Sequence, residues 1–566
     1  MRPSGLPSWS PLLLFLVGVL LPSEGASGQH PPSTEQTLAS SPRSPDTTAL
    51  GVVWTPPAPS DSALHELNRI DRLGATAVRL TRLPADTVAA RADTLGLDLY
   101  VDLPVKYVPT SQLQASLAGV ASVLERLRTV AGQHPSITHV GLAHTADTTV
   151  PAACGILRRW TERVHDGEGS VRTYYITPFA AAADRCADAV DRPLLDLRGH
   201  PAPVSHWQQW RTQTNSAGIG ALGTWVRPAA PAGLRVPHSP EWQARYLEQA
   251  LGRLLDSTRT APPVIFVSRW QDQVSSVLST RRYGLHETDG TPRPAARVVE
   301  GLYTGTQRVF AFPSGATPAA DSYGLLLIGW GLIALLGGLY AQSLFIRETV
   351  TRYFMAPGFY RDALRDGHDL HPGANVLLLG IVATALGTTG VCAARLAAQQ
   401  PVTEHVLTAL PPPVQTVLAG GVEHPVMAGV VIGGLALSVL GLWMGALVLA
   451  ARWQSRFSFA QGLVLVTWPC WPTLLILPIA LAAGPDAPVS PSLFALLLLG
   501  GSLIACLYVT GRVLYDYGAI TDLPTSTVLL LSTLSPAALV GAIVLLLTTW
   551  YDVSLPFLWH LATLTS

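Results

Sequence analysis

An uncharged apolar run of 23 residues, from residue 323 to residue 345, divides this 566-residue chain into two parts of different composition. A run of that length is long enough to cross a bilayer as an α-helix. The part before it has the mixed composition of a water-soluble domain, apart from one apolar segment at the very start. The part after it consists mainly of further apolar runs. The sequence therefore predicts a soluble domain joined to a membrane domain, whose partner is the lipid bilayer.

The first 28 residues have the pattern of a secretory signal peptide. Arg2 supplies a positive charge, residues 11–21 form an apolar segment, and small residues follow at 25–28. The alternative is an uncleaved membrane anchor, but the apolar segment is short for a span. Both alternatives predict that the soluble domain is exported. Residues 29–50 are rich in Ser, Thr and Pro, so we expect a disordered linker there.

Short apolar segments alternate with helical patterns through residues 51–315. One of these patterns, over residues 112–130, has a single apolar stripe and predicts one helix. The size and rhythm of the region match a closed (β/α)8 TIM barrel, an α/β fold. A doubly wound open sheet is the alternative, but no GxGxxG motif follows the first segment. The eight predicted strands are 51–55, 75–80, 98–104, 139–143, 172–177, 193–197, 217–225 and 263–268.

Six apolar runs predict an all-α bundle of six transmembrane helices. The first is 323–345, and the other five form a membrane domain over residues 373–550. Arg residues fall on alternate loops, with one exception at Arg395, so the positive-inside rule makes the amphipathic loop 346–372 cytoplasmic. The barrel and the tail, residues 551–566, are then extracytoplasmic, in agreement with the signal peptide. The five later runs are 374–394, 426–450, 462–483, 493–508 and 528–549.

The membrane domain offers few chemical groups. No charged residue is expected deep within a span, since Asp516 and Asp522 fall at or beyond a predicted span end. Buried charges mark ion and proton routes in membrane proteins, so this pattern argues against a proton-coupled transporter. Two prolines within residues 467–472 predict a kink in the fourth span.

Composition excludes several classes of ligand. The chain has 37 Lys and Arg against 37 Asp and Glu, and it lacks the basic excess of a nucleic-acid-binding protein. No CxxC or HExxH motif is present, so we predict no metal site and no cofactor. Cys154 and Cys186 lie in the exported part and could pair, but the sequence does not show whether they meet.

Polar and aromatic residues gather where the predicted strands end, which is where (β/α)8 barrels place their active sites. Tryptophans beside carboxylates and arginines suit sugars, because the indole stacks on C–H faces while charged groups bond hydroxyls. Each residue also has a structural alternative, since a strand-end Asp often caps the next helix. Lys106 and Arg269 lie at such ends too. The predicted ligand-binding residues are Trp54, His144, Arg198, Trp225 and Trp270.

Residues 283–302, YGLHETDGTPRPAARVVEGL, resemble the last strand-to-helix region of glycoside hydrolase family 2 barrels, the β-galactosidase and β-glucuronidase type. Residues 264–272 and 241–251 are similar to the eighth strand and the preceding helix of those barrels. The likeness covers about residues 51–310. It implies a (β/α)8 fold and the hydrolysis of O-glycosyl bonds.

The catalytic positions depart from that family. The resemblance places the family's acid/base Glu, in an Asn-Glu pair, at the end of the fourth strand, where this chain has His144 and Thr145. It places the nucleophile at Ala221. An Ala cannot attack an anomeric carbon and a Thr is not a useful acid at neutral pH. Retaining hydrolysis needs two carboxyls about 5–5.5 Å apart. Because Thr145 and Ala221 carry no carboxyl, the family's catalytic pair is missing.

Three functions are compatible with the sequence. The first is an exported barrel that has lost hydrolysis and binds carbohydrate, or acts as a scaffold, in handling envelope polysaccharides. The second is an active glycoside hydrolase with shifted carboxylates, for which the candidates are Asp102, Asp147, Asp196 and Asp272. The third is transport or trafficking in the membrane domain, which loosely resembles Yip1-type domains through the lead-in at residues 352–372. We rank the three in this order, and whether the protein is an enzyme stays open.

Overall fold

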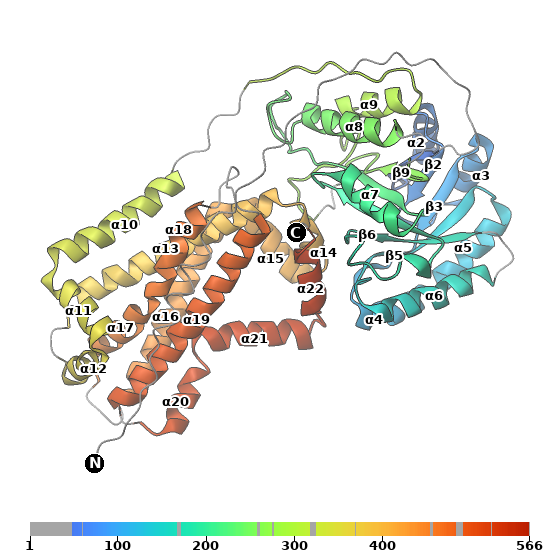
Figure 1. The fold of residues 1–566 in the computed structure, drawn as a ribbon. Coiled ribbons are helices and arrows are strands. Elements are labelled where there is room, and N and C mark those ends of the chain that lie inside the picture. Colours follow the sequence, from blue (N-terminus) through green and yellow to red (C-terminus); the bar gives the residue numbers. More distant parts are fainter. Residues whose placement is uncertain are drawn as a thin grey trace. The chain divides into compact units, whose positions relative to one another are not determined.

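The computed structural model places a barrel and a helical region in the chain (Figure 1). The predicted signal peptide, and the predicted linker as far as residue 47, lie outside the described residues. The structure describes residues 48–58, 60–166, 171–256, 261–273, 277–316, 324–367, 370–452, 457–482, 491–521 and 523–564.

Eight parallel strands close into a barrel, as predicted, because β3 pairs with β2 on one side and with β5 on the other. The one addition is β4, a three-residue strand beside the end of β5. Its pattern is too short to be recognised in the sequence. The strands are β1 (Ala49–Trp54), β2 (Ala77–Leu80), β3 (Asp98–Asp102), β4 (Lys106–Val108), β5 (Ile137–Ala146), β6 (Arg172–Thr177), β7 (Arg192–Arg198), β8 (Gly218–Gly223) and β9 (Val264–Val267).

The barrel strands are buried on both faces, which explains their nearly continuous apolar sequences. Three aromatic rings fill the interior, with Tyr100 packed edge-on against Phe266 and tilted against Tyr174. These rings require glycines on neighbouring strands. A Cβ at Gly51 would lie 2.7 Å from the Phe266 ring, and one at Gly141 would lie 2.6 Å from the Tyr174 ring.

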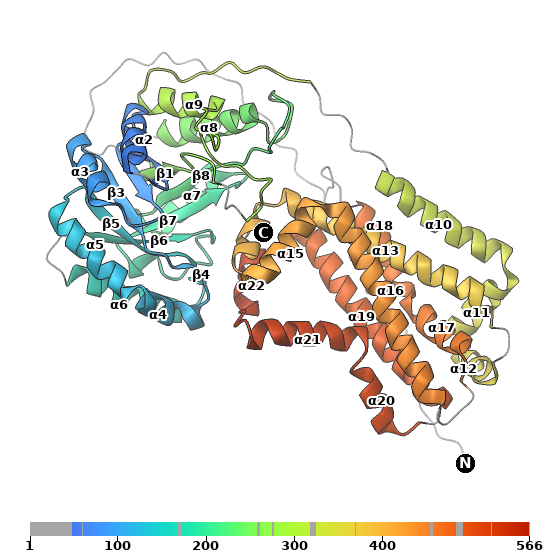
Figure 2. The same cartoon turned by 180° about the vertical axis from the view of Figure 1, so that it is seen from behind.

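Helices cover the outside of the barrel (Figures 1 and 2). The single helix predicted over residues 112–130 is wrong, because the chain breaks at Val120 and forms α4 and α5. The break lets both halves bury their leucines against the core. The helices are α2 (Ser60–Arg72), α3 (Asp86–Leu95), α4 (Thr110–Gly119), α5 (Ala121–Gln133), α6 (Pro151–His165), α7 (Pro203–Gln213), α8 (Pro240–Leu255) and α9 (Pro294–Tyr303).

A disulfide joins Cys154 on α6 to Cys186, with 2.10 Å between the sulfur atoms. This settles the pairing that the sequence left open. The bond ties α6 to the segment between β6 and β7.

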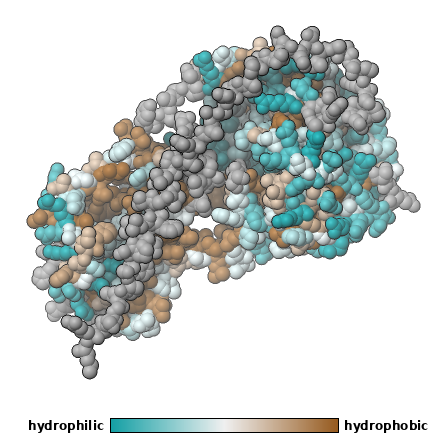
Figure 3. Space-filling model, in the orientation of Figure 1, coloured by the Kyte–Doolittle hydropathy of each residue, from teal (hydrophilic) through white to brown (hydrophobic). Residues whose placement is uncertain are grey.

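The C-terminal region is helical, and apolar side chains (brown in Figure 3) gather over it. Five helical segments of the described residues are long and apolar enough to cross a membrane, or up to six if α20 and α21, bent by 56°, form one span. The helices are α10 (Gly324–Gln342), α11 (Leu344–Met355), α12 (Pro357–Asp366), α13 (Pro372–Gln399), α14 (Val402–Thr408), α15 (Pro412–Glu423), α16 (Pro425–Arg452), α17 (Phe459–Thr467), α18 (Trp471–Ala482), α19 (Pro491–Thr521), α20 (Thr525–Ser532), α21 (Pro536–Thr549) and α22 (Leu555–Ala562).

Two spans differ in detail from the sequence analysis. A 3-10 turn, Trp468–Cys470, separates α17 from α18 where the two prolines lie. Helix α19 continues to Thr521, so the expectation that Asp516 lies at or beyond a span end is wrong. Asp516 is fully buried within the helix, 2.9 Å from the Arg512 Nε and 3.5 Å from the Arg361 Nε on α12. Two guanidiniums therefore accompany this buried carboxylate.

Candidate binding site at the strand ends

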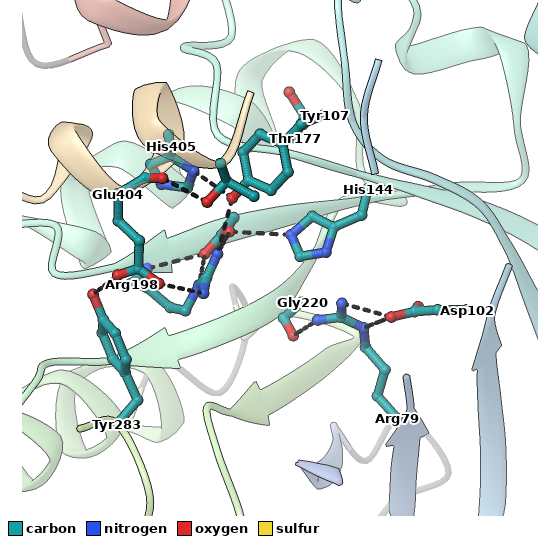
Figure 4. Close-up of polar contacts among 12 residues, drawn as sticks. Arg79, Asp102, Tyr107, His144, Thr177, Arg198, Gly220, Tyr283, Glu404 and His405 are labelled. Carbon is teal, nitrogen blue, oxygen red and sulfur yellow. Dashed lines mark hydrogen bonds and ion pairs between the residues drawn. The ribbon is translucent and has the colours of Figure 1, made fainter. Parts of the chain in front are cut away.

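A pocket of about 220 Å³ lies at the C-terminal ends of the barrel strands. Figure 4 shows several of its side chains converging from β4, β7, the segment after β9, and α14. A cavity of about 330 Å³ lies between α7 and α8, but Arg253 is its one charged lining residue. The strand-end pocket is lined by Lys106, Tyr107, His144, Arg198, Arg269, Asp272, Gln273, Val277, Arg281, Arg282, Tyr283, Glu404 and Thr408.

Asp196 and Arg198, from β7, form a buried ion pair beside the pocket (Figure 4). The Arg198 Nη2 donates to Asp196 at 2.7 Å, and the His144 ring lies 3.3 Å from the same carboxylate. Burial alone would raise the pKa of Asp196, but the Arg198 charge and the hydrogen bonds hold it well below its usual 3.8. Burial lowers the pKa of His144 to about 4, so this imidazole is neutral at pH 7. Asp196 is therefore an ionised, compensated carboxylate.

Asp102, at the end of β3, is compensated in the same way. The Arg79 Nη2 on β2 donates to Asp102 at 2.8 Å, and the Tyr174 hydroxyl donates at 2.6 Å. The other side of the guanidinium donates to the Gly220 carbonyl at 2.7 Å (Figure 4). Burial would raise the pKa of Asp102, but Arg79 outweighs it and holds the pKa below 3.8.

The other two candidate carboxylates are also engaged. Asp147 accepts a hydrogen bond from the Thr149 hydroxyl at 2.6 Å and lies 3.2 Å from the His560 ring on α22. Asp272 accepts from the Arg293 Nη2 at 2.5 Å and from the Gly284 backbone N–H at 2.8 Å. All four carboxylates proposed from the sequence therefore have donors on them.

Helix α14, between α13 and α16, contributes two side chains that the sequence analysis missed (Figure 4). The Tyr283 hydroxyl donates to Glu404 at 2.8 Å, and an Arg198 nitrogen lies 3.7 Å from the same carboxylate. The His405 Nδ1 lies 2.9 Å from the Tyr107 hydroxyl. The sequence held one signal for these residues. The loop between the second and third predicted spans, which contains α14, is charged and is predicted to lie on the same side of the membrane as the barrel.

Arg281 anchors the same region. Arg281 is 2 % exposed, and its guanidinium donates to the Gln400 carbonyl at 2.6 Å and lies over the Trp225 ring, 4.3 Å from the ring centroid. The accepting carbonyl follows the last residue of α13, where the helix dipole is negative. This contact joins the pocket to the end of a candidate membrane span.

The three predicted tryptophans are covered by protein in this structure. Trp54 is 1 % exposed and donates its indole N–H to Glu66 at 2.7 Å. Trp225 is 3 % exposed, between His238 and Arg281. Trp270 is 2 % exposed and packs on His286. Of the predicted ligand-binding residues, His144 and Arg198 line the pocket, and the contacts of all five with a ligand stay a prediction.

Thr145 and Ala221, the two residues in the catalytic positions of the resembled family, are both buried. Ala221 on β8 pairs in register with Asp196 on β7. The Thr145 hydroxyl has no hydrogen-bond partner among the described residues, and its φ is +61°, which is uncommon for a β-branched residue. Among the described residues, no three His, Cys, Asp or Glu side chains are grouped to hold a metal ion.

No protein-family model and no curated protein matches this chain. Solved structures similar to it include a GH2 β-galacturonidase from Eisenbergiella tayi (14 % identity, 46 % of this chain and 52 % of that one, TM-score 0.42). A β-D-glucuronidase from Dictyoglomus thermophilum has 12 % identity, covering 46 % and 51 %, with a TM-score of 0.40. An FMN-binding β-glucuronidase from Facaelibacterium prausnitzii has 15 % identity, covering 46 % and 44 %, with a TM-score of 0.41. The chain spans about half the length of these structures.

Proposed function

We propose that this protein is an exported, membrane-anchored barrel that binds carbohydrate, or acts as a scaffold, in handling envelope polysaccharides, without hydrolysing them. The observation that carries the proposal is the state of the carboxylates around the strand-end pocket. Asp102 and Asp196 are locked in buried ion pairs with Arg79 and Arg198. A pocket that keeps polar groups but has no free acid and nucleophile is suited to binding.

The arrangement opposes both forms of glycoside hydrolysis. A general acid needs a raised pKa, whereas the pKa values of Asp102 and Asp196 are lowered. A carboxylate nucleophile must reach the anomeric carbon. Asp196 is the carboxylate beside Ala221, but Arg198 donates to both of its oxygens.

Contacts between the barrel and the helical region support the proposed topology. Tyr107 contacts His405, Asp147 contacts His560, and the Gln112 amide donates to the Asp552 carbonyl at 2.8 Å. These contacts need the α14 loop and the C-terminal tail on the barrel's side of the membrane. The same sidedness follows from the signal peptide and the arginine distribution, with the 346–372 loop on the cytoplasmic side.

The test uses the full chain in detergent with a panel of oligosaccharides, and follows retention and product release together. We expect saturable retention without product. Product release that disappears in Asp147→Asn or Asp102→Asn, and survives in the exposed control Asp86→Asn, would instead establish an active hydrolase with shifted carboxylates. Absence of both retention and product would overturn the carbohydrate proposal.

Transport or trafficking in the helical region is the alternative, and buried Asp516 is the observation in its favour. Ionisable residues inside membrane bundles are often functional. Here the carboxylate lies between Arg361 and Arg512, which also suits a structural role. Asp516→Asn separates the two, because a structural role predicts lost stability in detergent, and a transport role predicts lost flux in a variant that stays folded.

A further inference from the structure

The strand-end pocket carries more positive than negative charge. Its cations are Lys106 and four arginines, and its carboxylates are Asp272 and Glu404. Two charged residues lie just outside the lining: Asp196, which pairs with Arg198, and Arg293, which pairs with Asp272. Their charges are opposite, so they leave the excess of positive charge unchanged. Three positive charges are therefore uncompensated among the described residues around the pocket.

Lys106 is the clearest of these charges. Its side chain makes no hydrogen bond or ion pair with any residue that the structure describes, although its backbone pairs with β5. Among the described residues, the Arg269 side chain donates one hydrogen bond, to the Gln273 amide oxygen at 2.9 Å, and Arg282 donates to the Gln273 carbonyl at 3.0 Å. The two guanidiniums are held by neutral acceptors, which leaves their charges uncompensated.

We propose that this pocket binds a phosphate, or another group with two or more negative charges, through Lys106, Arg269 and Arg282. Arginine forks bind phosphate oxygens in pairs, and lysine adds a point charge. A single carboxylate would neutralise one of the three excess charges, whereas a phosphate ester or diphosphate neutralises two or more. The volume of about 220 Å³ is below that of most ligand pockets, so it admits one end of a ligand rather than a polymer chain.

Two sources share this chemistry, a phosphorylated saccharide and a phosphate-bearing lipid head group. The first deepens the proposed function and rests on it. The second follows from the position of Arg281, which ties the pocket to the end of α13, a candidate membrane span. Lipid head groups lie at the ends of such spans.

Crowding of like charges also affects the titration of two of these cations. Desolvation lowers the pKa of Lys106, and the nearby Arg79, Arg269 and Arg198 charges lower it further against the opposing effect of Asp102. Desolvation and the Arg198 charge likewise lower the pKa of Arg269. A bound anion would reverse both effects.

Replacing Glu404 should strengthen anion binding, although most substitutions in a binding pocket weaken it. Its carboxylate lines the pocket and repels an incoming anion. Glu404→Gln keeps an acceptor for the Tyr283 hydroxyl and removes the charge, so an anion should bind roughly threefold or more tighter. A merely structural role for Glu404 would predict weaker binding.

The experiment is calorimetric titration of the full chain in detergent with inorganic phosphate, pyrophosphate, glucose 1-phosphate and, as the neutral probe, glucose. Lys106→Met should weaken pyrophosphate binding roughly tenfold or more, because one charge-assisted contact is lost. Lys106 is exposed and unpaired, so the substitution leaves the fold intact. Arg126→Gln, an exposed change on α5, is the matched control and should change nothing.

Nanodiscs distinguish the two sources. If lipid is the source, an equal mixture of phosphatidic acid and phosphatidylcholine weakens apparent pyrophosphate binding relative to phosphatidylcholine alone. If the source is soluble, both nanodiscs give the same affinity. The inference is overturned if no phosphate probe binds, if Lys106→Met binds like the unmodified chain, or if Glu404→Gln binds more weakly.

The outcomes also separate this inference from the proposed function. Neutral oligosaccharides that bind equally to the unmodified chain and to Lys106→Met, without phosphate binding, remove the anion site and keep the carbohydrate function. Phosphate binding that depends on Lys106, without retention of any saccharide, keeps the anion site and removes the carbohydrate function.

Discussion

The ion pair between Arg79 and Asp102 predicts a large and pH-dependent loss of stability when it is broken. Arg79→Met leaves the Asp102 carboxylate with the Tyr174 hydroxyl as its remaining side-chain partner. Both side chains of the pair are at most 3 % exposed, so water cannot solvate the remaining charge. Removing one partner of a buried pair costs about 3–5 kcal/mol. We expect a loss of this size in the free energy of unfolding of the barrel at pH 7.

The cost should shrink in acid. Without Arg79, burial raises the pKa of Asp102 above the 3.8 of an ordinary Asp, because the effect that lowered it is gone. A group with a raised folded pKa stabilises fully below its unfolded pKa, and this stabilisation is lost as the pH rises through the folded pKa. The penalty of Arg79→Met is therefore greatest at neutral pH and smaller near pH 4.

Removing both charges should recover much of the loss. Asp102→Leu alone strands a buried guanidinium and costs a similar 3–5 kcal/mol or so. In Arg79→Met/Asp102→Leu the Tyr174 hydroxyl loses its acceptor and the Gly220 carbonyl loses its Arg79 donor, but no buried charge is left unpaired, so the cost should be about 1–3 kcal/mol. The double variant should thus be more stable than either single one, which is a favourable coupling in a double-mutant cycle.

Hydrogen exchange of the full chain in detergent measures these values locally, on peptides that cover β2 and β3. Arg128→Met is the matched control, because Arg128 pairs with Glu125 on the surface and should change stability by no more than about 0.5 kcal/mol. The reasoning is refuted if Arg79→Met costs less than about 1 kcal/mol, if its cost is the same at pH 7 and pH 4, or if the double variant is no more stable than the singles.

Three further predictions concern the barrel. Gly141→Ala should destabilise it by about 1–3 kcal/mol, because the new Cβ would lie 2.6 Å from the Tyr174 ring; urea unfolding followed by hydrogen exchange of β5 measures this, and an unchanged β5 would contradict it. Cys154→Ala/Cys186→Ala opens a loop with a sequence separation of 32 and should cost about 3–4 kcal/mol, seen as a lower urea midpoint under oxidising conditions but not under reducing ones. Burial lowers the pKa of His139 to about 3, so the stability that comes from keeping this imidazole neutral is fully present above pH 6.5 and is lost as the pH falls. His139→Gln should reduce the loss of stability between pH 7 and pH 5 by about 2 kcal/mol, and an unchanged pH profile would count against it.

The barrel was predictable because its signals are local. Apolar segments of five to nine residues, separated by helical patterns, identified the eight strands that close the sheet. Strand β4 escaped because it has only three residues and pairs only with the end of β5. The helix break at Val120 escaped because one continuous apolar stripe is equally compatible with two helices. Asp516 was placed at a span end because the apolar run stops before it, and of its two partners Arg361 is remote in sequence.

The site was predictable only in part, because its composition depends on contacts between distant segments. The rule that barrel sites form at strand ends pointed to His144 and Arg198, and both line the strand-end pocket. The same rule selected Trp54, but the indole of this residue donates to Glu66 on α2. The position of a residue at a strand end does not fix the direction in which its side chain points. Glu404 enters from another domain, and no pattern within the barrel indicates it.

The contacts of α14 make ligand binding and domain contact mutually dependent. Glu404 accepts a hydrogen bond from Tyr283 and lies 3.7 Å from Arg198, and its carboxylate lines the same pocket as the cations that would attract an anion. An anion in the pocket repels this carboxylate and so weakens the contact of α14, and loosening α14 must strengthen anion binding by the same factor. The affinity gain of Glu404→Gln therefore also measures the electrostatic coupling between the pocket and α14. A gain that disappears at high salt would assign this coupling to screened charge, whereas a gain independent of salt would assign it to a rearrangement of α14.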